Sequence, residues 1–223
     1  MSFYRTYELY SLDEGPLKDF LSSYEYPWLC LGDIKAFVTS LTEKMKNDPE
    51  HMELEPGVVV HKSAKIAKSA LISPPCYIGE GAEIRHCAFI RGSAYIGKGC
   101  TVGNSTEIKN AVLTERVEAP HFNYVGDSVL GKKSHLGAGA VTSNVKSDRT
   151  DVSIRIDGKE YPTGRYKVGA FLGDGAEIGC NTTLCPGTVI GKRTSVYPCS
   201  CVRGGIEPDS IYKSKDSIIK RKA

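Results

Sequence analysis

The stretch VHKSAKIAKSALISPPCYIGEGAEIRHCAFIRGSAYIGKGCTVGNSTEIKNA, residues 60–111, decides the fold. Branched aliphatic residues recur in it every six positions, nine times without a slip. A small or turn-forming residue stands three positions after each of them. The aliphatic positions are Val60, Ile66, Ile72, Ile78, Ile84, Ile90, Ile96, Val102 and Ile108.

A period of six fits neither a helix nor an ordinary strand pair, whose side chains repeat about every 3.6 and every two residues. It fits a short strand followed by a corner, and three such units close one coil of a parallel β-helix. The aliphatic side chains then point inward and stack on their equivalents in neighbouring coils. The predicted fold class is therefore all-β. Because the ladder is a core, we expect functional residues where the period breaks.

The rest of the chain divides around this array. Residues 1–55 show no repeat, and apolar faces at helical spacing predict one helix after Pro16 and another from Ile34 to Met45. We expect these helices to cap the open end of the β-helix, since an uncovered solenoid end exposes core and strand edges. The β-helix spans residues 56–207. Residues 208–223 form a basic tail, predicted as a short helix or a frayed end.

The period breaks twice. The next anchors, Tyr124, Leu130 and Leu136, begin sixteen positions after Ile108, and the segment APHFNYVGD, residues 119–127, lies inside this break. The second break contains an insertion, residues 145–170, whose VSIRIDGKEY segment predicts a hairpin turning at Asp157. We expect that hairpin to have no core role, and to reach a neighbouring subunit or fold over a site.

The composition narrows the class of protein. The net charge is +3 over 223 residues, which calls for neither a nucleic-acid nor a membrane partner. No signal peptide or long apolar run is visible, so we expect a cytoplasmic protein. Among eight cysteines, Cys76 and Cys100 take a slot that alanine fills in other hexads, and no zinc-finger spacing occurs. We therefore expect no metal.

His121 is the best candidate for a catalytic base. It lies in the first break, follows Pro120 and is accompanied by Asn123 and Tyr124. A neutral imidazole is the natural acceptor of a proton from an attacking amine. By contrast, no glycine-rich phosphate loop opens a strand-to-helix unit, so we expect no uridylyltransferase activity.

Two sets of motifs resemble a known family. The hexads YIGEGA, YIGKGC, FLGDGA and VIGKRT resemble the hexapeptide-repeat family, whose fold is a left-handed parallel β-helix. The stretch from Arg91 to Asn144 resembles the acetyltransferase half of the bifunctional enzymes that acetylate glucosamine 1-phosphate and then form UDP-N-acetylglucosamine. The matching pieces are RG at Arg91, VGNSTEIKNA at 102–111, HFNYVGDSVLG from His121 and LGAGAVTSN ending at Asn144.

The resemblance implies an acyltransferase that uses acetyl-CoA as co-substrate and acts on an amino-sugar phosphate or a nucleotide sugar. His121 would be the general base. The implied acceptor contacts are Arg91 and Lys109 for the phosphate and Tyr124, Asn144 and His135 for the sugar. The implied donor contacts are Ala138, Cys180, Pro198 and Lys192. His135 and Cys180 depart from the family, which usually has asparagine and serine there, so the acceptor stays open.

The spacing of Arg91 and Lys109 adds a geometric expectation. They lie eighteen residues apart, which is one full coil, so their side chains should stand about 5 Å apart along the axis. They would form either a clamp for the acceptor's phosphate or a pair of solvated charges.

Two alternatives to an acyltransferase remain. The first is a non-catalytic sugar-phosphate-binding or regulatory module. The second is a protein like the zinc carbonic anhydrases, although His86, His121 and His135 are spaced by 35 and 14 residues, unlike that family's histidines.

We expect a homotrimer, because a β-helix presents three flat faces and the breaks need a partner surface.

Overall fold

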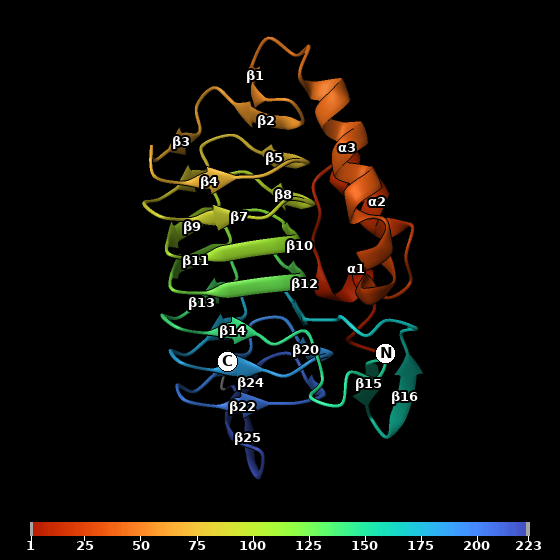
Figure 1. Ribbon diagram of the computed structural model, residues 1–223. Coiled ribbons are helices and arrows are strands. Elements are labelled where there is room, and N and C mark those ends of the chain that lie inside the picture. Colours follow the sequence, from red (N-terminus) through yellow and green to blue (C-terminus); the bar gives the residue numbers. More distant parts are fainter. Residues whose placement is uncertain (1, 222–223) are drawn as a thin grey trace.

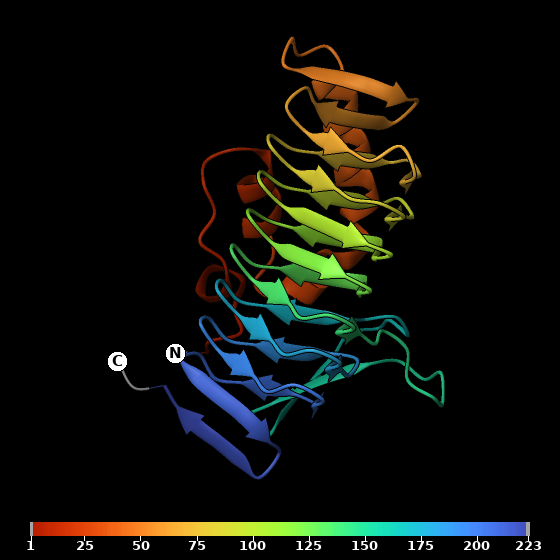
Figure 2. The same ribbon diagram turned by 90° about the vertical axis from the view of Figure 1, so that its left-hand side faces the viewer.

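The computed structural model describes residues 2–221 and is a parallel β-helix flanked by helices (Figure 1). Its coils stack along one axis, and each coil has three short strands separated by corners (Figure 2). The ladder residues predicted from the sequence point into the coils and form one continuous core. The predicted fold class is thus confirmed.

The strands line three faces. The first face holds β2 (Val58–His61), β5 (Cys76–Ile78), β8 (Ala94–Ile96), the end of β10 (Glu107–Leu113), the end of β12 (Tyr124–Leu130), β17 (Ala170–Leu172), β20 (Thr188–Ile190) and β23 (Gly205–Ile206). The second face holds β3 (Lys65–Ile66), β6 (Glu83–Ile84), β9 (Thr101–Asn104), β11 (Glu118–His121), β13 (His135–Leu136), β18 (Glu177–Ile178), β21 (Ser195–Val196) and β24 (Ser210–Ser214). The third face holds β4 (Leu71–Ile72), β7 (Phe89–Ile90), the starts of β10 and β12, β14 (Val141–Thr142), β19 (Thr183–Leu184) and β22 (Cys201–Val202).

The first break of the period is a shortened corner. Ile90 pairs with Ile108, eighteen residues on, whereas Ile108 pairs with Val125, seventeen residues on. The predicted anchor Tyr124 was therefore wrong, since Val125 is the fully buried residue and Tyr124 points outward, half-buried. The missing residue makes β10 and β12 continuous around the corner, with Asn110 and Asp127 at φ 47° and 49°.

The N-terminal segment covers a side of the β-helix. It contains α1 (Thr6–Leu9), α2 (Pro16–Ser22), the 3₁₀ helix η1 (Pro27–Gly32) and α3 (Ile34–Met45), which run along the first face (Figure 1). Trp28 is buried here together with Phe171, an outward residue of β17. The helices are thus present as predicted, but they do not close the open end. At that end β1 (His51–Glu55) pairs antiparallel with β2. The helices lie on the first face because its outward side chains are apolar and need cover.

The insertion also has a core role, contrary to the sequence-based expectation. It forms the predicted hairpin of β15 (Ser153–Ile156) and β16 (Lys159–Pro162), which turns at Asp157. Ile154 and Ile156 are buried against the N-terminal segment, and the Tyr161 hydroxyl lies 2.8 Å from that of Tyr4. The hairpin therefore fastens the insertion to the helices of its own chain.

The C-terminal tail is neither helical nor frayed within the described residues. β24 continues the parallel stack by pairing with β21, and β25 (Ser217–Lys220) returns antiparallel to β24. Ile206 and Tyr212 continue the buried ladder, and Tyr212 takes it past residue 207. The coil continues because these two apolar side chains are buried in the core of the β-helix.

Candidate functional site

The third face lies between two corners that carry most of the predicted site residues. We call them the His121 corner, where the second face turns into the third, and the Lys109 corner, where the third face turns into the first. The outward side chains between them are half-buried and come from successive coils. They are Phe89, Glu107, Tyr124 and Val141.

The His121 corner is a regular column. Backbone N–H groups of one coil donate to carbonyl oxygens of its neighbour, from Gly139 to His121 (3.0 Å), from Asn181 to Ala138 (2.8 Å) and from Cys199 to Cys180 (2.8 Å). Pro198 directly precedes Cys199 and therefore belongs to the same column. The structure therefore brings together the predicted base and three of the predicted donor contacts, Ala138, Cys180 and Pro198.

Asn123 holds the turn after His121. It is 3% exposed, and its Oδ1 accepts from the His121 backbone N–H at 3.1 Å. Its Nδ2 donates to the carbonyls of Gly137 (2.8 Å) and Ala140 (3.0 Å). The exposed His121 imidazole makes no hydrogen bond with any of residues 2–221. The turn is fixed while the ring remains available to a ligand.

At the Lys109 corner, the predicted stacking of two cations is present in the backbone register. The Arg91 N–H donates to the Ile108 carbonyl at 2.8 Å, one coil away. Each cation has its own carboxylate, however: Arg91 lies 2.7 Å from Glu107, and Lys109 lies 3.5 Å from Asp127. These carboxylates offset the repulsion expected between stacked cations.

Asp127 connects two further predicted acceptor contacts, Asn144 and Tyr124. It is 3% exposed and accepts from Nδ2 of Asn110 at 2.8 Å and from Nδ2 of Asn144 at 2.6 Å. Asn144 Nδ2 also donates to the Tyr124 hydroxyl at 3.1 Å. Burial, and next the negative charge of Asp127, raise the pKa of Tyr124. Its hydroxyl therefore stays neutral at physiological pH and can donate a hydrogen bond.

A cavity of about 550 Å³ opens beside this network. It is lined by Arg91, Lys109 and Asp127, and also by Lys35 of α3 and by Arg165 and Lys167 of the insertion. Sequence reasoning missed these three cations. They lie 56 or more residues from Arg91 along the chain, and no repeat relates them to the corner.

Two predicted site residues lie elsewhere. His135 is on the second face, where its Nδ1 is 3.0 Å from Glu177. Lys192 lies at the remaining corner, between the first and second faces, with its Nζ 3.3 Å from Asp174 and 2.9 Å from the Ser11 hydroxyl. Neither residue joins the His121 column within the chain.

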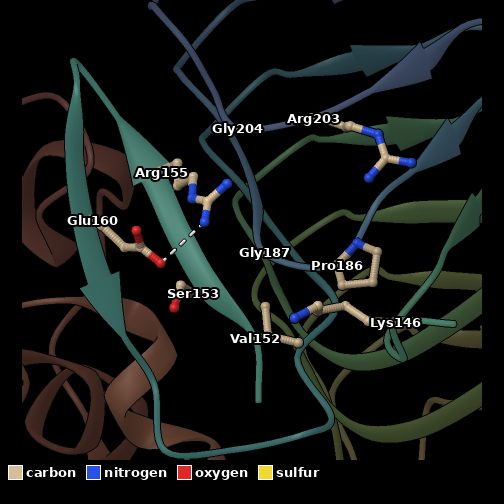
Figure 3. Close-up of a pocket in the computed structure, with 9 residues that line it drawn as sticks. All are labelled: Lys146, Val152, Ser153, Arg155, Glu160, Pro186, Gly187, Arg203 and Gly204. Carbon is tan, nitrogen blue, oxygen red and sulfur yellow. Dashed lines mark hydrogen bonds and ion pairs between the residues drawn. The ribbon is translucent and has the colours of Figure 1, made fainter. Parts of the chain in front are cut away.

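A second pocket of about 410 Å³ lies on the other side of the insertion (Figure 3). Lys146, Arg155 and Arg203 surround it, and Arg155 is 3.3 Å from Glu160. Figure 3 shows Gly187 and Gly204 on the coil side of this pocket. A Cβ on Gly204 would meet the Arg155 carbonyl at 2.8 Å, so glycine allows the hairpin to pack closely on the coils.

The described residues hold neither a candidate membrane-spanning helix nor a candidate metal cluster. No helix within residues 2–221 is long and apolar enough to cross a membrane. The same residues contain no group of three or more His, Cys, Asp or Glu side chains that could hold a metal ion.

Comparison with known proteins gives related sequences. The family model for the GMPPB C-terminal domain matches residues 72–157. The chain is 30% identical over 189 residues to a bifunctional sugar-1-phosphate nucleotidylyltransferase/acetyltransferase of Sulfurisphaera tokodaii, covering 84% of this chain and 47% of that protein. It is 29% identical over 208 residues to the bifunctional protein GlmU of Methanococcus maripaludis, covering 92% and 50%. The chain thus spans about half the length of these two relatives.

A third relative is closer in size. The chain is 31% identical over 163 residues to YaiX of Escherichia coli, described only as an uncharacterized acetyltransferase, covering 73% of this chain and 70% of that protein. The stacked hexads and these matches lead to one conclusion: the chain belongs to the hexapeptide-repeat acyltransferase family.

Proposed function

We propose that this protein transfers an acetyl group from acetyl-CoA to the amine of a phosphorylated amino sugar. The observation that carries the proposal is the third face, which has a free imidazole at one corner and two stacked cations at the other. Tyr124 lies between the two corners, and its hydroxyl accepts a hydrogen bond from Asn144. A sugar bound on this face would lie between the imidazole and the cations, beside Tyr124. The acetyltransferase relatives support the reaction class.

In the proposed reaction, His121 takes a proton from the acceptor amine as the nitrogen attacks the thioester carbonyl. A C–N bond forms, the C–S bond breaks, and the proton passes from the imidazole to the departing CoA thiolate. The backbone N–H of Ala138 has no acceptor among residues 2–221 and sits one coil from His121. It can donate to the developing oxyanion. No covalent enzyme intermediate is required.

A CoA-release assay across several acceptors tests the proposal. Glucosamine 1-phosphate, galactosamine 1-phosphate and UDP-amino sugars should be compared with their N-acetylated forms, which lack a free amine. We expect release only with a free amine. If no acceptor released CoA although one of them bound, the alternative of a non-catalytic binding module would replace this proposal.

We expect Arg91→Ala and Lys109→Ala each to raise KM for a phosphorylated acceptor about 10- to 100-fold, the usual worth of a charge-assisted hydrogen bond. KM for acetyl-CoA should change little, because the donor column lies at the other corner. Steady-state kinetics with each substrate varied in turn measures both constants. Lys98→Ala is the matched control, since Lys98 pairs with Glu80 at a different corner. Unchanged acceptor KM in both variants would contradict the phosphate assignment.

We also propose that the protein acts as a homotrimer. Phe122, next to the candidate base, is 60% exposed within one chain. A neighbouring subunit packed on this corner would bury it and close the donor column. Light scattering at micromolar concentration should give three times the chain's 24.2 kDa. A monomer would contradict a shared site.

A further inference from the structure

The cavity beside the Lys109 corner extends beyond the two predicted phosphate contacts. Seen from His121, Arg91 and Lys109 stand at its near edge, at the end of the third face. Its other walls come from η1, α3 and the end of the insertion. At about 550 Å³ the cavity lies within the range of sites that hold whole small-molecule ligands. An amino-sugar monophosphate bound with its phosphate at Arg91 and Lys109 would leave the far part unused.

The far part carries the uncompensated charge. Arg91 and Lys109 each have a carboxylate partner, as described above. Lys35, Arg165 and Lys167 have no carboxylate within 4 Å among residues 2–221. Five cationic and two acidic side chains therefore line one cavity. Asp127 lies at the corner and Asp151 on the wall formed by the insertion, and the three cations away from the corner outnumber Asp151. Such a surplus favours a second anionic group.

The fold positions two of these cations, Arg165 and Lys167. A Cβ on Gly32 would lie 2.9 Å from Nη1 of Arg165, so the glycine lets the guanidinium lie against the η1 backbone. The Arg165 N–H donates to the Thr163 hydroxyl at 3.2 Å. Two residues on, Lys167 forms a backbone bridge with Val145, and the Val168 N–H donates to the Asn144 carbonyl at 2.9 Å. The cationic wall is thereby tied to the acceptor network.

The residue between these two cations in the sequence is aromatic. Tyr166 is 52% exposed and lines the same cavity, and the Lys167 ammonium lies 5.2 Å from its ring centroid. An exposed ring beside a phosphate-binding wall offers a stacking surface for a nucleobase. Beyond the imidazole, the sugar contacts and the two paired cations, the site therefore continues into a wall that holds three further cations and an aromatic ring.

We infer that the acceptor is a nucleoside diphosphate amino sugar, with its second phosphate bound by Lys35, Arg165 and Lys167 and its base on Tyr166. This inference rests on the proposed acetyl transfer for its kinetic test, and nucleotide binding tests it independently. The sugar-linked phosphate lies at Arg91 and Lys109, and the sugar amine faces His121.

The kinetic test compares UDP-glucosamine with glucosamine 1-phosphate, which differ only in the uridylyl group. We expect kcat/KM to be at least tenfold higher for UDP-glucosamine. The double variant Arg165→Ala/Lys167→Ala should lower kcat/KM for UDP-glucosamine at least tenfold more than for glucosamine 1-phosphate. Lys159→Ala is the control, because Lys159 is an exposed cation in the hairpin of the same insertion, outside the cavity. Equal losses for the two acceptors, or a preference for the monophosphate, would overturn the inference.

Calorimetric titration with UDP and with UDP-N-acetylglucosamine provides the second readout. We expect both to bind the unmodified protein and the Lys159→Ala variant, and to bind the double variant at least tenfold more weakly. If the double variant unfolds, Tyr166→Ala replaces it and should also weaken binding. Binding without CoA release would support the nucleotide site and refute the acetyl transfer. Undetectable UDP binding to the unmodified protein would refute the site, whatever the enzyme acetylates.

Discussion

Replacing His121 with alanine should lower kcat for acyl transfer about 10²- to 10⁴-fold, the usual contribution of a positioned general base. The imidazole is exposed at its corner and makes no hydrogen bond with residues 2–221, so its loss should disturb no packing. Asn123 would still hold the turn through the His121 backbone N–H. Circular dichroism and melting temperature should therefore stay as in the unmodified protein while single-turnover acetyl transfer slows.

His86→Ala is the matched control for that experiment. His86 stands in the same corner column, two coils away, and its Nδ1 pairs with the Ser69 hydroxyl. We expect activity close to that of the unmodified protein. A large loss in His86→Ala together with a nearly silent His121→Ala would assign the base to the other histidine.

Gly103→Ala should lower the stability of the fold more than any of the substitutions described above. A Cβ at this position would lie 1.6 Å from the carbonyl oxygen of Pro120, and that atom belongs to the backbone of the next coil. Strand β11 must then move away, and His121 is the residue that follows Pro120. We expect the free energy of unfolding to fall by about 3 kcal/mol, the upper end of the usual cost of overpacking. For a chain of this size the melting temperature would fall by about 6 to 12 °C.

Thermal unfolding and CoA release should be measured together for this variant. Gly158→Ala is the control, because Gly158 has open space around it at the hairpin turn, with φ +72°. Gly158→Ala should lower the free energy of unfolding by about 1 to 2 kcal/mol through backbone strain alone, and it should leave activity unchanged. An unchanged melting temperature for Gly103→Ala would show that the coils at β9 and β11 can separate without cost.

The features that the sequence predicts correctly are local or periodic. The ladder from Val60 to Ile108 fixes which residues point inward, because each position sees the same neighbours one coil away. The turn at Asp157 is set by two consecutive residues with positive φ. The register of Arg91 over Lys109 follows from counting alone.

The features that the sequence does not predict depend on contacts between distant segments. Nothing near Lys109 in the sequence indicates that Asp127 will be its partner, because that contact requires two shortened coils in succession. The place of α3 depends on the apolar outward residues of the first face, which look like any alternating strand pattern. Arg165 approaches the site only because the insertion folds back onto η1.

The contact between the hairpin and the N-terminal segment has a consequence for exchanging parts between relatives. Tyr161 packs edge-on or tilted against the rings of Tyr4, Tyr26 and Trp28. An insertion transplanted alone into a relative would lose its contacts with these three rings. The resulting protein would then have exposed aromatic rings. Exchange between relatives, natural or engineered, is therefore constrained: the first 45 residues and the insertion must be exchanged together, although residues 46–144 separate them in the sequence.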